Sequence, residues 1–109
     1  MHLAMAAVEL TASPQAPHQR LNPNLLTDVL WAYAEPADRP EHLTVLTGEG
    51  RADLVLYSLA ESAQEARSGA LHLVRRALST SPLLSGWEAR EIPLDHLDAL
   101  GAPDLERPP

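Results

Sequence analysis

The sequence predicts an α+β domain of the ferredoxin-like βαββαβ type, in which two helices cover one face of a four-stranded antiparallel sheet. Three observations favour this fold. Two β-type runs, 42–47 and 53–59, are separated by a short glycine-containing link, which is typical of a hairpin. One capped helical pattern precedes this hairpin and another follows it. Further β-type runs over 3–11 and 87–92 complete the order.

The first half of the chain supplies a strand and a helix. Residues 3–11 suit either element by composition, but the nearby Pro14 would stop a helix early and favours a short strand. Asn22 and Pro23 then mark a helix start, with asparagine as the N-cap and proline at the first helical position. The helix carries one apolar stripe and ends before Pro36; the stripe consists of Leu25, Leu26, Val29, Leu30 and Tyr33.

The second half supplies the other helix and the last strand. Ser62 and Glu65 have the spacing of a capping box at a helix start. Apolar residues follow at helical spacing, namely Ala66, Ala70, Leu73, Val74, Ala77 and Leu78. After the strand over 87–92, a short C-terminal helical turn is expected over 95–100. We therefore predict a single domain over 1–101 and a mobile, proline-rich tail over 102–109.

Charge and composition exclude several classes of function. The 109 residues include 8 Lys+Arg and 15 Asp+Glu, a formal net charge of −7. This balance disfavours binding to nucleic acid and to anionic membranes, both of which need clustered basic residues. No apolar stretch approaches the roughly 18–20 residues of a membrane span, and the N-terminus lacks a signal-peptide pattern. A cytoplasmic protein is expected, and the use of arginine without lysine suggests an actinobacterial-like source.

One face of the predicted sheet has no helix over it, yet about half of its residues are apolar. Strand alternation places these residues there: Met5, Ala7, Glu9, His42, Thr44, Leu46, Val55, Tyr57 and, near one edge, Trp87. A solvated face is normally mostly polar, so we expect something to cover it. Candidates are a second copy or another protein, a small molecule in a pocket, or the chain's own N-terminal connection or C-terminal turn. We predict a protein interface at Leu46, Val55, Tyr57 and Trp87.

His42 and Tyr57 are the candidates for catalysis. Both are predicted on the open face of adjacent strands, where a histidine and a tyrosine in a half-apolar cavity can serve as acid and base. Such a site suits a cofactor-free cyclisation or oxygenation, and the layout resembles small ferredoxin-like dimers of actinobacterial biosynthetic pathways. The simpler interpretation is a packed tyrosine beside a histidine at a strand end.

The remaining polar groups point to no metal and no cofactor. The histidines lack metal-ligand spacing, cysteine is absent, and the acids around His96 are explained by a helix cap. No nucleophile elbow or phosphate loop is present. His72, Arg75 and Arg76 form a predicted basic patch on the second helix, which either complements the helix dipole or receives an anion or a protein partner.

No motif in the sequence indicates a particular reaction, so we expect the protein to function by associating with another copy of itself or with another protein. We predict a small cytoplasmic interaction or dimerisation module, or an accessory subunit, that acts through its open sheet face. One alternative is a cofactor-free enzyme or small-molecule binder with His42 and Tyr57 in its cavity. Another is an acidic neutraliser of a basic protein, which the net charge of −7 permits.

Overall fold

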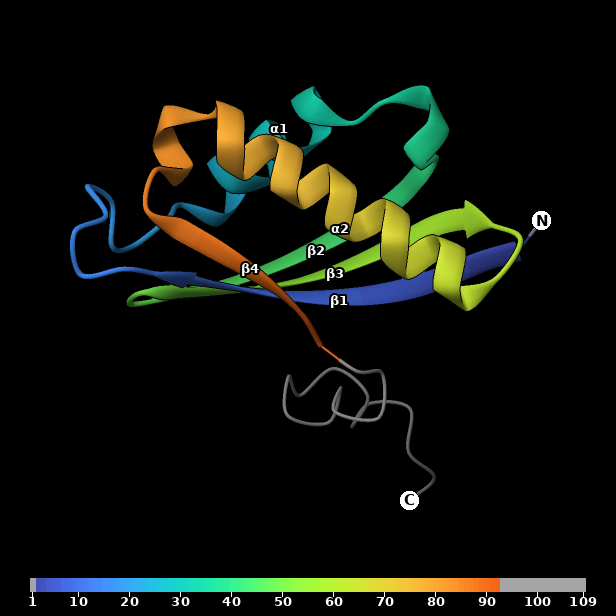
Figure 1. Cartoon of the computed structure of the whole chain (residues 1–109), viewed down its shortest axis with the longest axis horizontal. Coiled ribbons are helices and arrows are strands. Elements are labelled where there is room, and N and C mark those ends of the chain that lie inside the picture. Colours follow the sequence, from blue (N-terminus) through green and yellow to red (C-terminus); the bar gives the residue numbers. More distant parts are fainter. Residues whose placement is uncertain (1, 93–109) are drawn as a thin grey trace, which may run out of the picture.

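The computed structural model describes residues 2–92, apart from the side chain of Ala37, and confirms the predicted fold class. The strands are β1 (His2–Ala12), β2 (Pro40–Gly48), β3 (Arg51–Ala60) and β4 (Trp87–Ile92), and the helices are α1 (Pro23–Tyr33) and α2 (Ala63–Thr80). All strand pairs are antiparallel, in the order β2-β3-β1-β4 that a ferredoxin-like chain requires. Both helices lie on the same face of the sheet (Figure 1). The turn expected over 95–100 and the tail over 102–109 lie outside the described residues.

Both helices begin at the predicted caps. The Asn22 side chain accepts hydrogen bonds from the backbone N–H groups of Asn24 and Leu25, at 2.9 and 3.1 Å. The Ser62 hydroxyl accepts from the backbone N–H of Glu65 at 3.1 Å, and the Glu65 carboxylate accepts from the backbone N–H of Glu61. The bonds from Asn24, Leu25 and Glu65 satisfy N–H groups that the first helical turn leaves without partners.

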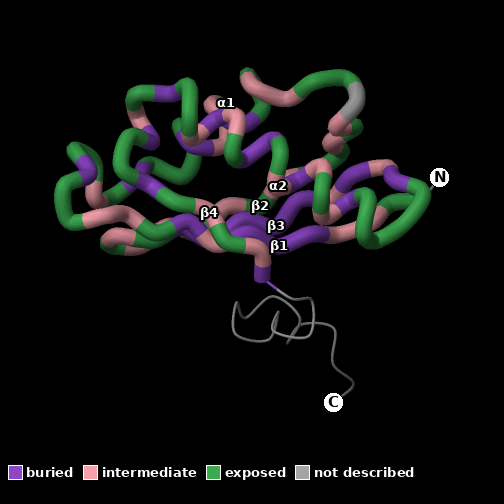
Figure 2. The backbone as a smooth tube through the Cα atoms, in the orientation of Figure 1, coloured by how far each residue is buried: buried purple, intermediate pink, exposed green. Residues whose placement is uncertain are grey.

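The core lies between the helices and the facing side of the sheet, where buried strand and helix segments meet (Figure 2). Alternate residues of the two central strands enter it, namely Ala6, Val8, Leu10, Ala52, Leu54 and Leu56. Of the stripe predicted for α1, Leu26 and Leu30 are buried, and Val29 and Tyr33 are partly buried against the core. Leu25 is the exception, with 47% of its surface exposed. This stripe packs α1 mainly against α2 and the edge strand β2.

Trp87 lies on the helix-covered side of the sheet, so its predicted place on the open face was wrong. It pairs with Ala12, is only 5% exposed, and donates a hydrogen bond from its indole Nε1 to the His18 carbonyl oxygen at 2.8 Å. Both sides of β4 carry an apolar residue, Trp87 on one and Ile92 on the other. Alternation alone therefore cannot decide which side of β4 faces the helices. A shift of one residue in the strand register would exchange the side chains of the two sides.

The connection between β1 and α1 is a candidate cover for the open face, but it packs elsewhere. Its residues Ala16 and Leu21 are buried in the core on the helix side.

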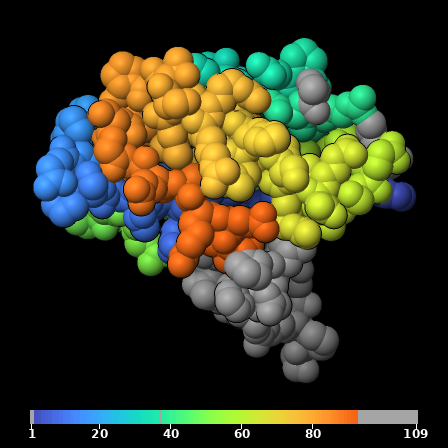
Figure 3. Space-filling model, viewed as in Figure 1, coloured from blue at the N-terminus to red at the C-terminus, as the bar shows by residue number. Residues whose placement is uncertain are grey.

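Helix α2 and the edge strand β4 form the side of the molecule seen in Figure 3. Among the described helices, none combines the length and apolar character that a membrane span requires.

Candidate functional site

The register of the sheet arranges the open face in bands. One band is charged and has Leu46 at its end; across the strands it reads Leu46, Asp53, Glu9 and Arg90. The next is apolar and contains Thr44, Val55, Ala7 and Ile92. The third contains His42, Tyr57 and Met5, and beyond it Leu59 pairs with Leu3. Apolar and charged groups are therefore separated along the strands.

Exposed leucines flank the apolar bands, and buried residues lie at the centre of the face. Leu3 is 60% exposed and Leu46 is 52% exposed, whereas Ala7 and Val55 are buried. Of the four residues predicted to form the interface, Leu46, Val55 and Tyr57 share this face, and Trp87 does not. Leu3 was missed, although it has the same strand parity as Met5 and alternation could have identified it.

His42 and Tyr57 are directly opposite each other in β2 and β3. Their ring centroids are 5.9 Å apart, with an angle of 50° between the ring planes. The His42 side chain is exposed, and its Nε2 lies 3.5 Å from the Thr44 hydroxyl. The protomer by itself does not enclose the pair, so acid–base chemistry here requires a second surface that excludes water.

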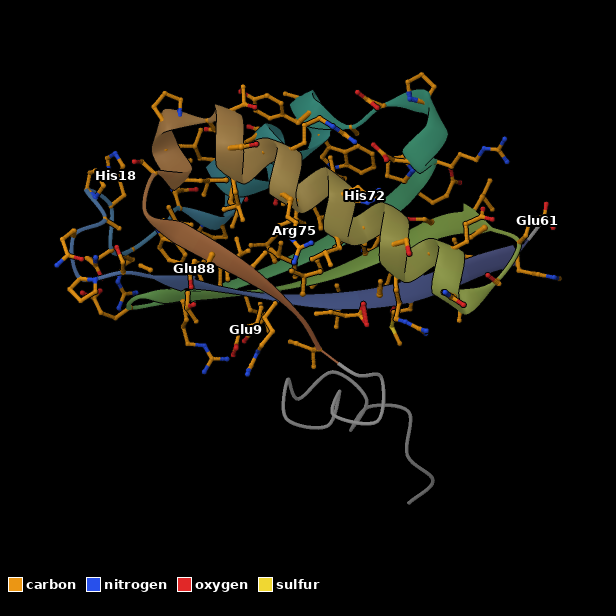
Figure 4. All side chains as sticks on the ribbon, viewed as in Figure 1. Glu9, His18, Glu61, His72, Arg75 and Glu88 are labelled. Carbon is orange, nitrogen blue, oxygen red and sulfur yellow. The ribbon has the colours of Figure 1, made fainter. Side chains whose placement is uncertain are left out.

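A row of ion pairs crosses the charged band, and sequence reasoning did not identify it. Arg90 binds Glu9 with a 2.7 Å contact, and Arg51 binds Asp53 with a 2.6 Å contact. Arg51 also lies 3.9 Å from Glu9, which joins the two pairs. Figure 4 shows Glu9 on the side of the sheet that faces away from the helices. The second oxygen of Asp53, Oδ1, is buried without a hydrogen-bond partner.

The predicted basic patch on α2 does not form a single anion-binding surface. The Arg76 guanidinium donates to the Tyr33 carbonyl oxygen at 2.8 Å and to Asp38 Oδ2 at 3.1 Å, and it lies 3.5 Å from Glu35. His72 and Arg75 remain exposed on α2 (Figure 4). Arg76 is drawn away because the 3₁₀ helix η1 (Pro36–Asp38) packs against α2 and offers it carboxylates.

Arg76 therefore ties α2 to the connection that follows α1, and its loss should destabilise the fold. We expect Arg76→Met to lower the free energy of unfolding by about 1.5–3 kcal/mol, the usual worth of hydrogen bonds to a charged group. Arg75→Met, at an exposed position of the same helix, should change it by less than about 0.5 kcal/mol. Urea denaturation of both variants measures the difference in their free energies of unfolding. Equal losses in the two variants would contradict the role of Arg76 in holding α2 to the connection that follows α1.

Two of the hollows on the described surface border the charged residues discussed above. The first, of about 330 Å³, lies between α2, η1 and the end of β3. Its lining is mixed: Leu59, Ala60 and Ala66 contribute apolar surface, and the charged or hydroxyl-bearing residues include Glu35, Asp38, Ser58, Glu65, His72 and Arg76. The second, of about 370 Å³, lies against β1 and β4 beside the ion pair of Glu9 and Arg90. Neither includes His42 or Tyr57.

No group of three potential metal ligands gathers anywhere within residues 2–92. The acids around His96 lie outside that range. The chain matches no family model, no curated protein and no solved structure. Any assignment of function therefore depends on the geometry of the open face and of the polar cleft beside α2.

Proposed function

We propose that this protein is a small association module that pairs with a second copy of itself through the open sheet face. The observation that carries the proposal is the exposure of Leu3 and Leu46, at 60% and 52%, on a face that no described helix covers. Burying large aliphatic side chains of this kind removes apolar surface from water, which is the main driving force of association.

The charges of the face support a second copy as the partner. The chain has a net charge of −7, which would make two copies repel each other at most contacts. The ion-pair row instead contains two acids and two arginines, so it is neutral as a unit. A two-fold interface presents the same patch from both subunits and must therefore be self-complementary. Aliphatic bands beside a charge-neutral ion-pair row suit that requirement.

The test measures solution mass by light scattering at low and high micromolar protein. We expect the wild type to have the mass of a dimer at both concentrations. Leu46→Asp should give a monomer, because a carboxylate would be buried without a partner at two symmetric places. That cost is about 2–5 kcal/mol for a buried unpaired charge, which raises the dimer Kd by about 30-fold or more.

The matched control is Leu25→Asp on α1, a leucine of similar exposure (47%) on the opposite side of the molecule. It should leave the dimer intact. A monomeric wild type at both concentrations would overturn the proposal and favour an accessory subunit that needs a different protein. A dimeric Leu46→Asp variant would overturn the choice of this face.

A second candidate function is favoured by the contact between His42 and Tyr57, whose rings are 5.9 Å apart. Two open faces brought together would enclose this pair and supply the apolar surroundings that a cofactor-free acid–base site needs. A structure of the dimer should then contain an enclosed cavity of about 300 Å³ or more bordered by both side chains. A dimer in which either side chain is excluded from such a cavity would remove this candidate.

A further inference from the structure

The polar cleft beside α2 has a buried hydroxyl group at its floor. Ser58 lies on the helix-facing side of β3, where the preceding inward residues are Leu54 and Leu56. Ser58 is 6% exposed and borders the cleft, and its hydroxyl is not among the fully buried polar atoms that lack a partner, so the hydroxyl is open to the cleft. A hydroxyl that faces an open cleft and is bound to no neighbouring side chain can form a hydrogen bond with a molecule that enters the cleft.

Space above Ser58 is maintained by a glycine in the middle of α2. A Cβ atom added to Gly69 would meet nothing within 4 Å, so close packing does not explain the glycine. Its backbone also lacks the positive φ that would require it. Glycine is unfavourable in a helix interior compared with alanine. The residue therefore weakens the helix and leaves the wall of the cleft open.

The charges around the cleft have an excess of carboxylates. Glu35, Asp38 and Glu65 line it, and Arg76 is its one guanidinium among the described lining residues. Arg76 already contacts Glu35 and Asp38. The Asp38 side chain is 10% exposed, and its hydrogen bonds from Arg76 and from the Glu35 backbone N–H both use Oδ2. Its Oδ1 is thus available as an acceptor at the edge of the cleft.

We propose that this cleft binds a small organic cation, with a primary ammonium or guanidinium group directed at the Ser58 hydroxyl and the Asp38 carboxylate. The groups without partners accept hydrogen bonds, and a cationic nitrogen donates several. A volume of about 330 Å³ suits a small molecule. An anion is disfavoured because the guanidinium that would receive it is already neutralised. The cleft lies on the helix side of the sheet, so this inference does not depend on the proposed dimer.

The test titrates the isotopically labelled full chain with n-butylammonium and n-butylguanidinium and follows its amide resonances by NMR. Butyrate and butanol, of similar size, are the anionic and neutral controls. We expect one or both cations to shift the amides of Ser58, Ala60, Gly69 and His72 in a saturable way. The absence of a saturable shift with both cations, or an equal response to butyrate, would overturn the proposal.

Cation binding by variants distinguishes a specific site in the cleft from a general attraction of cations to an acidic protein. Gly69→Leu should fill the cleft and abolish the saturable shifts. Ser58→Ala should weaken binding about tenfold, since it removes a hydrogen bond to a charged group. Arg75→Ala, on the same helix but outside the cleft, should leave binding unchanged. Binding that persists unaltered in both cleft variants would place the cation elsewhere and overturn the site.

Gly69→Ala provides a control for folding, because its added methyl group meets no protein atom within 4 Å. It should raise the midpoint of thermal unfolding through improved helix propensity. It should also weaken cation binding, by less than Gly69→Leu, because one methyl group takes up little of the space. Reduced binding in a more stable protein cannot be attributed to unfolding. Binding as strong as in the wild type in both Gly69 variants would contradict the proposed position of the ligand.

Discussion

Replacing Trp87 by alanine is expected to lower the free energy of unfolding by about 3–5 kcal/mol, the usual cost of removing a buried tryptophan side chain. The indole is 5% exposed and belongs to the main core cluster. Its Nε1 also donates to the His18 carbonyl oxygen at 2.8 Å, so the variant leaves that acceptor without its partner. Such a loss is a large fraction of the stability of a small domain.

Chemical denaturation of Trp87→Ala beside Trp31→Ala measures this effect against a matched control. Trp31 is 42% exposed on α1, and its removal should cost no more than about 1 kcal/mol. Comparable losses in the two variants would contradict the burial of Trp87. A variant that keeps its stability but loses the proposed dimer would instead return Trp87 to the open face.

Gly86→Ala is expected to destabilise the fold by about 2–5 kcal/mol, for two reasons that add. Gly86 has φ = +82°, a left-handed conformation that L residues adopt only at a cost of about 1–3 kcal/mol. A Cβ atom there would also lie 2.9 Å from both the Cα and the Cβ of Ala16. The connection cannot easily move aside, because the Ser13 backbone N–H is bound to the Gly86 carbonyl oxygen at 2.8 Å.

Gly69→Ala is the same substitution at a position with a different backbone conformation and different surroundings, so comparing the two variants shows how much the position matters. That substitution should stabilise the protein by about 0.5–1 kcal/mol, because Gly69 sits in a helix with open space around it. Thermal unfolding of the two variants should therefore shift in opposite directions. A Gly86→Ala protein as stable as the wild type would contradict the turn that leads into β4.

Local signals predicted the elements of this fold. The Asn22 and Ser62 caps depend on bonds to residues at most three positions away, and the central hairpin depends on its own short link. Alternation in β1, β2 and β3 also assigned Leu46, Val55 and Tyr57 to the open face. Each of these features depends on residues that are close together in the sequence, so a single amino-acid sequence is enough to predict it.

Tertiary packing alone decided the position of Trp87 and the partners of Arg76. Trp87 donates to a carbonyl 69 positions away, and Arg76 reaches Asp38 across 38 positions. The pair of Arg90 and Glu9 is separated by 81 positions. The register of β4 on β1 and the packing of η1 on α2 create these contacts. Local sequence preferences determine neither the register nor this packing. The sequence by itself therefore determined the elements and the open face, whereas the pair of Arg90 and Glu9 and the polar cleft arise only where segments distant along the chain meet.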